Sequence, residues 1–138
     1  MQVSEAMSIQ VVTAKPTDTV QDVARIMSEI DSGAVPIVDG GVVVGLITDR
    51  DIVVRVVAEG GDISSAVKEF MTEGVESCLE DDDITDAANL MAEMQMRRLV
   101  VYNNDGALTG ILSLGDIALE HRGDLASFAL EEISEDDD

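Results

Sequence analysis

The stretch GLITDRDI (residues 45–52) returns as GILSLGDI (residues 110–117), with a glycine, two apolar residues, a hydroxyl residue and an aspartate at the same spacing. Upstream of it, VSEAMS (residues 3–8) returns 64 residues later as VKEFMT, and VQDVA (residues 20–24) returns as ITDAA. The segments 45–52 and 110–117 lie 65 residues apart instead of 64, so the second repeat has one inserted residue, in the turn around residues 103–106. A period this long favours two tandem units that pack together over a solenoid of short repeats.

Hydrophobic periodicity and turn residues predict the same order of elements in both repeats. The first repeat is expected to hold a strand at 11–13, a helix that starts near Val20 and ends at Gly33, strands at 34–38 and 42–48 joined by a tight turn at 39–41, and a helix from Thr48 to Gly60. The second repeat is expected to hold a strand at 77–78, a helix at 84–94, strands at 99–102 and 107–112, and a helix from Leu114.

The composition bounds the size and the chemistry of the core. At 138 residues the chain can form one compact domain or two half-domains that share a core. Apolar residues make up 46% of the chain but aromatic residues only 2%, so the core must be built from Val, Ile, Leu, Ala and Met. The single cysteine, Cys78, excludes an internal disulfide and is expected to be a small, half-buried strand residue.

The chain carries a formal charge of −21, from 29 acidic against 8 basic residues. Self-repulsion of this size destabilises a compact state at ordinary salt and is screened at molar salt. The charge resembles that of cytoplasmic proteins in organisms that accumulate molar salt, with an acidic mesophilic protein as the alternative. It disfavours nucleic acid as a partner. No apolar run is long enough to span a membrane and no signal peptide is recognisable, so a soluble cytoplasmic protein is expected.

The motifs together resemble a pair of cystathionine β-synthase (CBS) domains, the Bateman module, of the stand-alone haloarchaeal type. The resemblance is carried by the Met-Ser and Met-Thr pairs at residues 7–8 and 71–72, Pro16, VPIVD at 35–39, and the Gly-apolar-apolar-Thr/Ser-x-x-Asp signature at each hairpin exit. It implies an α+β fold of two β-α-β-β-α repeats in pseudo-two-fold packing, with the sheets together and the helices outside. The limits are residues 1–63 and 64–123, followed by an acidic tail at 124–138.

The resemblance also implies a function. Proteins of this family are regulatory modules that bind adenosine compounds such as AMP, ADP, ATP, S-adenosylmethionine or NAD in clefts between the repeats. They commonly dimerise and pass the ligand state to an effector, for which this chain has no further domain. Neither an enzymatic activity nor a metal site is expected.

Thr48 with Asp51, and Ser113 with Asp116, admit two interpretations. A hydroxyl residue followed three positions later by an acid is a capping box, which satisfies free amides at the start of a helix and needs no ligand. The resemblance implies instead that the hydroxyl contacts a phosphate and that the carboxylate accepts hydrogen bonds from the ribose hydroxyls. The two roles can coexist.

The few arginines distinguish the two sites. The resemblance implies that basic residues before the second strand of one repeat serve the site of the other repeat. Arg97 and Arg98 hold that position, and their counterparts are Gly33 and Ala34. The Thr48/Asp51 site would then receive Arg97 or Arg98, while the Ser113/Asp116 site would receive at most Arg50. The Thr48/Asp51 site is therefore expected to fill first.

By resemblance, the adenine lies against small or apolar residues at strand starts. These are Val12, Thr13, Val35 and Pro36 for one site, and Ser77, Leu99 and Val100 for the other.

The sequence admits two rival interpretations of function. In the first, the chain is a ligand-free dimerisation or scaffold module, and both hydroxyl-aspartate pairs only cap helices. In the second, the acidic clusters at residues 80–83 and 135–138 bind cations, although a solvated face explains them better. The acidic end, residues 131–138, is expected to stay disordered. His121, the single histidine, is expected to cap a helix or face solvent rather than act as a base.

The charge generates the first testable prediction. Raising KCl from low to molar concentration is expected to raise the melting temperature, because like-charge repulsion is screened. Thermal unfolding followed by circular dichroism at several salt concentrations checks this. A melting temperature that stays flat or falls with salt would contradict it.

Overall fold

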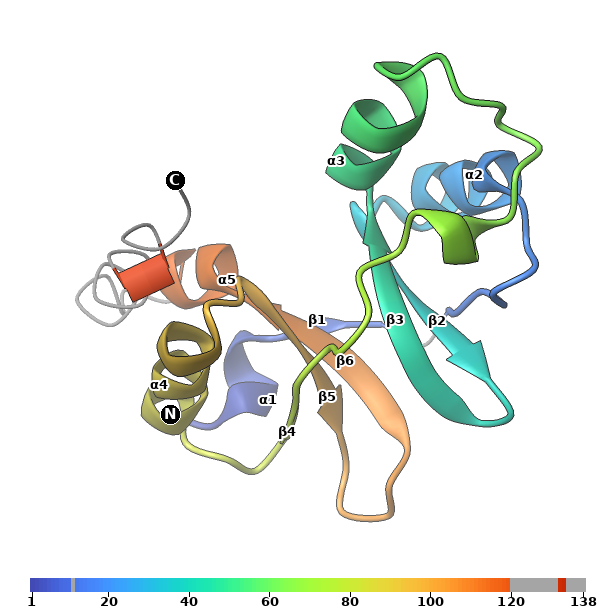
Figure 1. Ribbon diagram of the computed structural model, residues 1–138. Coiled ribbons are helices and arrows are strands. Elements are labelled where there is room, and N and C mark those ends of the chain that lie inside the picture. Colours follow the sequence, from blue (N-terminus) through green and yellow to red (C-terminus); the bar gives the residue numbers. More distant parts are fainter. Residues whose placement is uncertain (11, 120–131, 134–138) are drawn as a thin grey trace. The chain divides into compact units, whose positions relative to one another are not determined.

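The computed structural model describes residues 1–10, 12–119 and 132–133, and its contacts divide the chain into two compact units. One unit, called here the first-repeat unit, is Val12–Val75. The other, called the second-repeat unit, combines Met1–Val11 with Glu76–Asp138. The compact units therefore do not follow the sequence repeats. Residues 1–10, at the start of the first repeat, pack with elements of the second repeat (Figure 1). Residues 64–75, at the start of the second repeat, pack with elements of the first.

The first-repeat unit is a β-hairpin with a helix against it. Its elements are α2 (Val20–Ile30), β2 (Ala34–Asp39), β3 (Val42–Thr48), α3 (Asp49–Asp51), the π-helical segment η1 (Ile52–Val57) and the short 3-10 helix η2 (Val67–Glu69). Gly40 and Gly41 form the two-residue hairpin turn with φ of 58° and 81°. Positive φ at both turn residues gives the twist that adjacent antiparallel strands need, and glycine adopts it without strain.

Of the strand expected at residues 11–13, the described residues Val12 and Thr13 are not in a strand, and the next residue, Ala14, forms an isolated bridge to Ile37. Val11 itself lies outside the described residues. The second repeat does form its strand, β4 (Ser77–Leu79), and there the Val100 N–H donates to the Glu76 carbonyl at 3.2 Å. The residue corresponding to Val100 is Pro36, which has no N–H to donate. The proline thus removes the hydrogen bond that would extend this strand.

The second-repeat unit is built on a four-stranded sheet of order β1-β6-β5-β4. Its elements are α1 (Val3–Ala6), β1 (Ser8–Ile9), β4, α4 (Ile84–Met94), β5 (Arg98–Tyr102), β6 (Leu108–Ser113) and α5 (Leu114–Leu119). β5 pairs antiparallel with β6 and parallel with β4, and β1 pairs antiparallel with β6. In the first-repeat unit isolated bridges mark the same arrangement, with Thr72 beside Leu46 of β3 and Ala14 beside Ile37 of β2.

Each unit has its own apolar core of aliphatic side chains. In the first-repeat unit Val23, Val35, Ile37 and Ile47 are fully buried. In the second-repeat unit the core includes Val3, Ile84, Met91, Leu99 and Leu112, also fully buried. Two cores, each closed by a segment from the neighbouring repeat, replace the single shared core expected from the sequence.

Three local expectations need correction. α2 ends at Ile30 with Asp31 in the left-handed region (φ 52°), and Gln95 (φ 56°) plays the same part after α4, so Gly33 is not the helix stop. Cys78 is buried rather than half-buried, at 8% exposure. Ile133 is buried in the second-repeat core, so the expectation of disorder is wrong for this residue. His121 and most of the acidic tail lie outside the described residues.

The α+β fold predicted from the sequence is confirmed, with a helix packed on the strands of each unit. Among the described residues no helix has the length and apolar character needed to cross a membrane.

Two corresponding glycines, Gly45 and Gly110, lie where residues 71–72 and residues 7–8 pass close beside strands β3 and β6. A Cβ at Gly45 would lie 2.6 Å from Met71 Sδ and 2.9 Å from the Thr72 carbonyl oxygen. A Cβ at Gly110 would lie 2.6 Å from the Ser8 carbonyl oxygen. Backbone atoms cannot withdraw cheaply, so both positions require glycine.

We expect Gly45→Ala to lower the free energy of unfolding by about 1–3 kcal/mol, because the added methyl group overpacks the crossing segment. Gly115→Ala is the matched control. A Cβ there meets its nearest atom at 3.5 Å, an ordinary contact, so this helical change should be neutral or stabilising. Urea titration of both variants measures the difference. Equal stabilities would show that the close crossing at Gly45 imposes no constraint.

Candidate functional site

The hairpin exit of the first-repeat unit is fixed by a reciprocal pair of hydrogen bonds. Thr48 Oγ1 accepts the Asp51 N–H at 3.1 Å, and Asp51 Oδ2 accepts the Thr48 N–H at 2.9 Å. Arg55 Nε lies 3.8 Å from Asp51 Oδ1. Thr48 is extended (φ −114°, ψ 162°), so the chain changes from strand to helix at this residue. The capping interpretation is therefore correct for Thr48 and Asp51.

The second-repeat unit repeats this geometry at its own hairpin exit. Ser113 Oγ accepts the Asp116 N–H at 3.1 Å, and Asp116 Oδ2 accepts the Ser113 N–H at 3.0 Å. In both units the cap uses the hydroxyl only as an acceptor and uses one carboxylate oxygen. The hydroxyl proton and the other carboxylate oxygen remain capable of hydrogen bonding to a ligand, so capping does not exclude binding.

The residues expected at strand starts are brought beside these caps, each set within its own unit. Ala34 is opposite Thr48 in the β2–β3 ladder, and Val35 is opposite Ile47. Val35 is fully buried and Pro36 is buried, whereas Thr13 is half-buried and Val12 is 36% exposed. The Val35 side chain is thus a core residue.

The second set follows the same rule. Ser77 is exposed and is opposite Val100 in the parallel β4–β5 pair. Leu99 is fully buried and Val100 is 1% exposed. Arg98 is opposite Ser113, and the Arg97 carbonyl accepts the Leu114 N–H at 3.1 Å. Both arginines therefore belong to the second-repeat unit, at the edge that carries Ser113 and Asp116. Their assignment to the Thr48/Asp51 site stays a prediction.

The divergence between the repeats at this edge has a steric cause. In the first-repeat unit the Gly33 carbonyl accepts the Asp49 N–H at 2.9 Å, and a Cβ at Gly33 would lie 2.9 Å from Asp49 Oδ2. In the second-repeat unit the same two positions are Arg97 and Leu114. The Asp49 carboxylate thus occupies space beside residue 33 that a side chain would need. Arg50 is exposed, and its backbone N–H donates to Asp49 Oδ1 at 2.8 Å.

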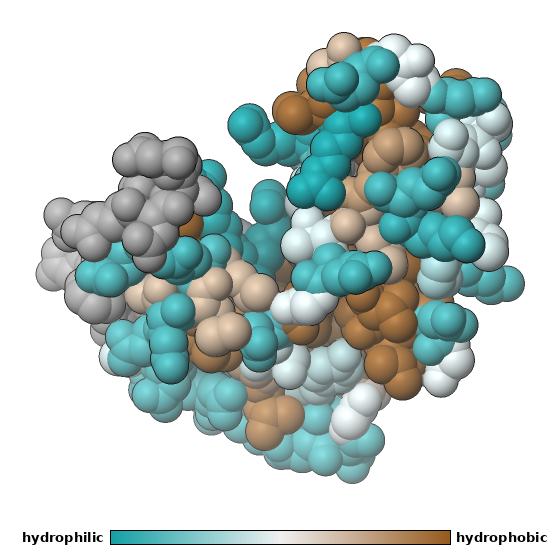
Figure 2. Space-filling view, in the orientation of Figure 1, coloured by the Kyte–Doolittle hydropathy of each residue, from teal (hydrophilic) through white to brown (hydrophobic). Residues whose placement is uncertain are grey.

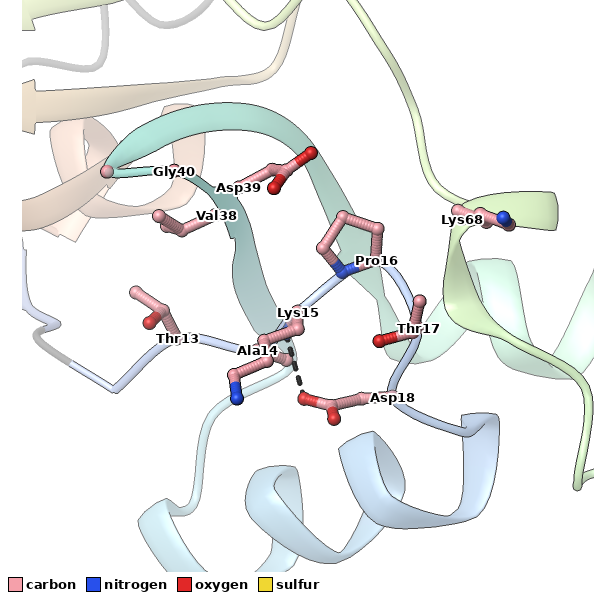
Figure 3. Close-up of a pocket in the computed structure, with 11 residues that line it drawn as sticks. Thr13, Ala14, Lys15, Pro16, Thr17, Asp18, Val38, Asp39, Gly40 and Lys68 are labelled. Carbon is pink, nitrogen blue, oxygen red and sulfur yellow. Dashed lines mark hydrogen bonds between the residues drawn. The ribbon is translucent and has the colours of Figure 1, made fainter.

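A pocket of about 660 Å³ lies at the opposite end of the β2–β3 hairpin (Figure 3). It is lined by residues 13–18, by residues 38–41 at the hairpin tip, and by Lys68. Of these only Thr13 was expected at a site. The sequence signal that could have indicated this pocket is the position of the lysines, since Lys15 and Lys68 are the only two in the chain.

Catalytic and metal-binding candidates find little support in the described part of the chain. Burial raises the pKa of the Cys78 thiol to about 11, and the negative charge of Asp82 contributes to the shift. Cys78 is therefore protonated at neutral pH and a poor nucleophile. Within residues 1–10, 12–119 and 132–133 no cluster of His, Cys, Asp or Glu could hold a metal ion. In the 80–83 cluster, Asp82 and Asp83 accept N–H groups of Leu79 and Thr85.

Known proteins share both the sequence pattern and the fold. The family model described as the CBS domain matches residues 3–58 and again residues 67–122. The CBS domain-containing protein YhcV of Bacillus subtilis is 38% identical over 133 residues, which cover 96% of this chain and 94% of YhcV. The chain therefore belongs to the CBS domain family, as a protein with two CBS domains in tandem.

Two solved structures are similar in fold and in sequence. The CBS domain pair of protein MJ0100, in complex with 5′-methylthioadenosine and S-adenosyl-L-methionine, has a TM-score of 0.74 and 26% identity over 90% of this chain and 98% of that one. Hypoxic Response Protein I, a structure with two coordinated zinc ions, has a TM-score of 0.69 and 30% identity, covering 86% of this chain and 98% of that one.

Proposed function

We propose that the chain is a regulatory module that senses an adenosine compound and has no catalytic activity of its own. The observation that carries the proposal is the pair of capping boxes, one in each unit, which present a hydroxyl and a partly used carboxylate beside the start of a neighbouring strand. The adenosine ligands of the similar MJ0100 domain pair support this choice of ligand class.

Three kinds of protein group are proposed to contact the ligand. The carboxylate oxygens of Asp51 and Asp116 that the caps do not use accept hydrogen bonds from the ribose hydroxyls, and for Asp51 this oxygen also lies 3.8 Å from Arg55 Nε. Hydrogen bonds to a carboxylate are charge-assisted and therefore strong. Backbone groups at the strand starts, near Val35 and Leu99, recognise the polar edge of the adenine. Arg97 and Arg98 are the cations proposed to recognise a phosphate.

Asp51→Ala is expected to weaken binding of an adenine nucleotide by about 1.5–3 kcal/mol, the usual worth of a hydrogen bond to a charged group. Calorimetry with AMP, ADP, ATP, S-adenosylmethionine and NAD at molar KCl measures this. Thr19→Ala is the matched control. Thr19 Oγ1 caps α2 in the same unit by accepting the Asp22 N–H at 3.1 Å, so the change removes a cap but no ribose contact.

Equal affinities of the wild type and Asp51→Ala would remove Asp51 from the ribose role. In the same titrations, replacing Arg97 and Arg98 by Ala should weaken AMP far more than adenosine, because only AMP carries a phosphate. A loss shared equally by AMP and adenosine would contradict the phosphate role of the two arginines.

Dimerisation is the second candidate function, and exposed apolar side chains in one segment favour it. Val53, Val54 and Val57 in η1 are 57%, 45% and 62% exposed, while Val56 of the same segment is fully buried. Apolar surface at this segment is visible at the top of Figure 2. The three valines form a contiguous apolar face of the kind that marks an interface. We propose that this face binds a second copy of the chain, alongside ligand sensing.

Light scattering at micromolar protein concentration in high salt is expected to show a dimer for the wild type and a monomer for the double variant Val53→Glu, Val57→Glu. Charges placed in an apolar interface must be desolvated without partners, which opposes association. Val42→Glu is the matched control, because Val42 is 62% exposed at the hairpin turn, away from this face. A monomeric wild type would refute the dimer.

A further inference from the structure

The pocket at the hairpin tip of the first-repeat unit, called here the lysine pocket, shares only Thr13 with the residues expected at the adenosine site and contains neither Thr48 nor Asp51. Strand β3 runs from Val42, beside the pocket, to Thr48 at the proposed site. Seven strand residues separate the two ends by roughly 20 Å. The pocket volume of about 660 Å³ lies within the range of small-molecule binding sites.

Both lysines of the chain line this one pocket, although the chain as a whole carries a charge of −21. Their backbones are held in place, since the Lys15 N–H donates to Asp18 Oδ2 at 2.8 Å and the Lys68 N–H donates to the Pro16 carbonyl at 3.1 Å. In the view of Figure 3, Pro16 lies between the two lysines, with the Thr17 hydroxyl near Asp18.

The second-repeat unit contains the same corner of backbone, and this provides an internal comparison. The Lys15 N–H donates to Asp18 Oδ2 at 2.8 Å, as the Leu79 N–H donates to Asp82 Oδ2 at 2.9 Å. The Val67 N–H donates to the Asp18 carbonyl at 2.8 Å, as the Val3 N–H donates to the Asp82 carbonyl at 2.9 Å. The Lys68 N–H donates to the Pro16 carbonyl at 3.1 Å, as the Ser4 N–H donates to the Glu80 carbonyl at 2.9 Å.

The side chains on this common backbone differ in charge. Lys15 and Lys68 correspond to Leu79 and Ser4, while Pro16 and Thr17 correspond to Glu80 and Asp81. The second-repeat corner therefore keeps its backbone hydrogen bonds with leucine and serine where the first has lysines. The ammonium groups are not needed to build this corner, so its architecture does not account for them.

We propose that the lysine pocket binds a small phosphate ester that also carries hydroxyl groups. Figure 3 shows the two lysine side chains on opposite sides of Pro16, and both are exposed. Once turned toward the pocket, their ammonium groups are suitable donors to a phosphate, which lysine binds as a point charge. Asp18 and Asp39 also line the pocket. Their carboxylates offset the lysine charges, which disfavours a bare polyanion, and they offer acceptors to hydroxyl groups of the ligand. The site is independent of the adenosine site.

Glycerol 3-phosphate is the probe that tests this proposal, with glycerol as the uncharged comparison. Calorimetry on the full chain at about 0.15 M KCl, where charge interactions are less screened than at molar salt, is expected to show saturable binding of glycerol 3-phosphate and none of glycerol. The double variant Lys15→Leu, Lys68→Ser places the residues of the second-repeat corner in the first. It is expected to bind at least about ten-fold more weakly.

Two controls make the result specific. Arg25→Gln removes an exposed cation of the same unit that does not line the pocket, and Asp51→Ala alters the proposed adenosine site. Both should keep the wild-type affinity for glycerol 3-phosphate. The lysine variant should keep its affinity for adenosine compounds, so failure of either proposal is recognised separately.

Several outcomes would overturn the proposal: absence of saturable binding by the wild type, equal binding of glycerol, an unchanged affinity of the lysine variant, or the same loss in Asp51→Ala. Circular dichroism verifies the folding of each variant. If the double variant does not fold, Lys68→Ser alone decides the question, because the backbone bond to Pro16 is retained. That single change is expected to weaken binding several-fold.

Discussion

The two reciprocal hydrogen bonds between a hydroxyl residue and an aspartate organise each unit of this protein. In the first-repeat unit the Thr48–Asp51 pair ends a strand and starts a helix at the same residue, since it satisfies amides that both elements would leave free. The cap also sets where a carboxylate can meet a ligand. Because Thr48 is opposite Ala34, that carboxylate lies beside the start of β2. The candidate site is thus a consequence of how the hairpin ends.

A duplicated backbone with diverged side chains is the main route to asymmetry in this chain. The caps at Thr48 and Ser113 have the same two hydrogen bonds, with lengths within 0.1 Å of one another. Two neighbouring positions differ together between the repeats. The first repeat has Gly33 beside Asp49, whose carboxylate occupies the space of a side chain at residue 33, and the second repeat has Arg97 and Leu114 at these positions. At the hairpin tip the first-repeat corner carries Lys15 and Lys68 where the second-repeat corner carries Leu79 and Ser4. Function is therefore expected to differ between units whose backbones are alike.

Two features of the surface are unfavourable for a folded monomer in water at low salt. A charge of −21 opposes compaction unless salt screens it, and the exposed valines of η1 present apolar surface to water. Salt screens the repulsion between acidic surfaces, and this reduces the electrostatic cost of the proposed dimer. The proposed ligand site and the proposed dimer face therefore both lie on the segment that starts at Thr48.

The sequence by itself determined the duplication, the order of elements, the β2–β3 hairpin and both caps, because each depends on residues within a few positions of one another. It also carried the reason for the shortened strand before α2, since Pro36 has no N–H. Only the tertiary structure decided the packing of residues 1–10 in the second-repeat unit, the burial of Ile133, and the presence of Lys15 and Lys68 in the lining of one pocket. These are contacts between residues far apart in the chain. Local periodicity contains no information on them, because they depend on which surfaces the folded elements leave to be covered.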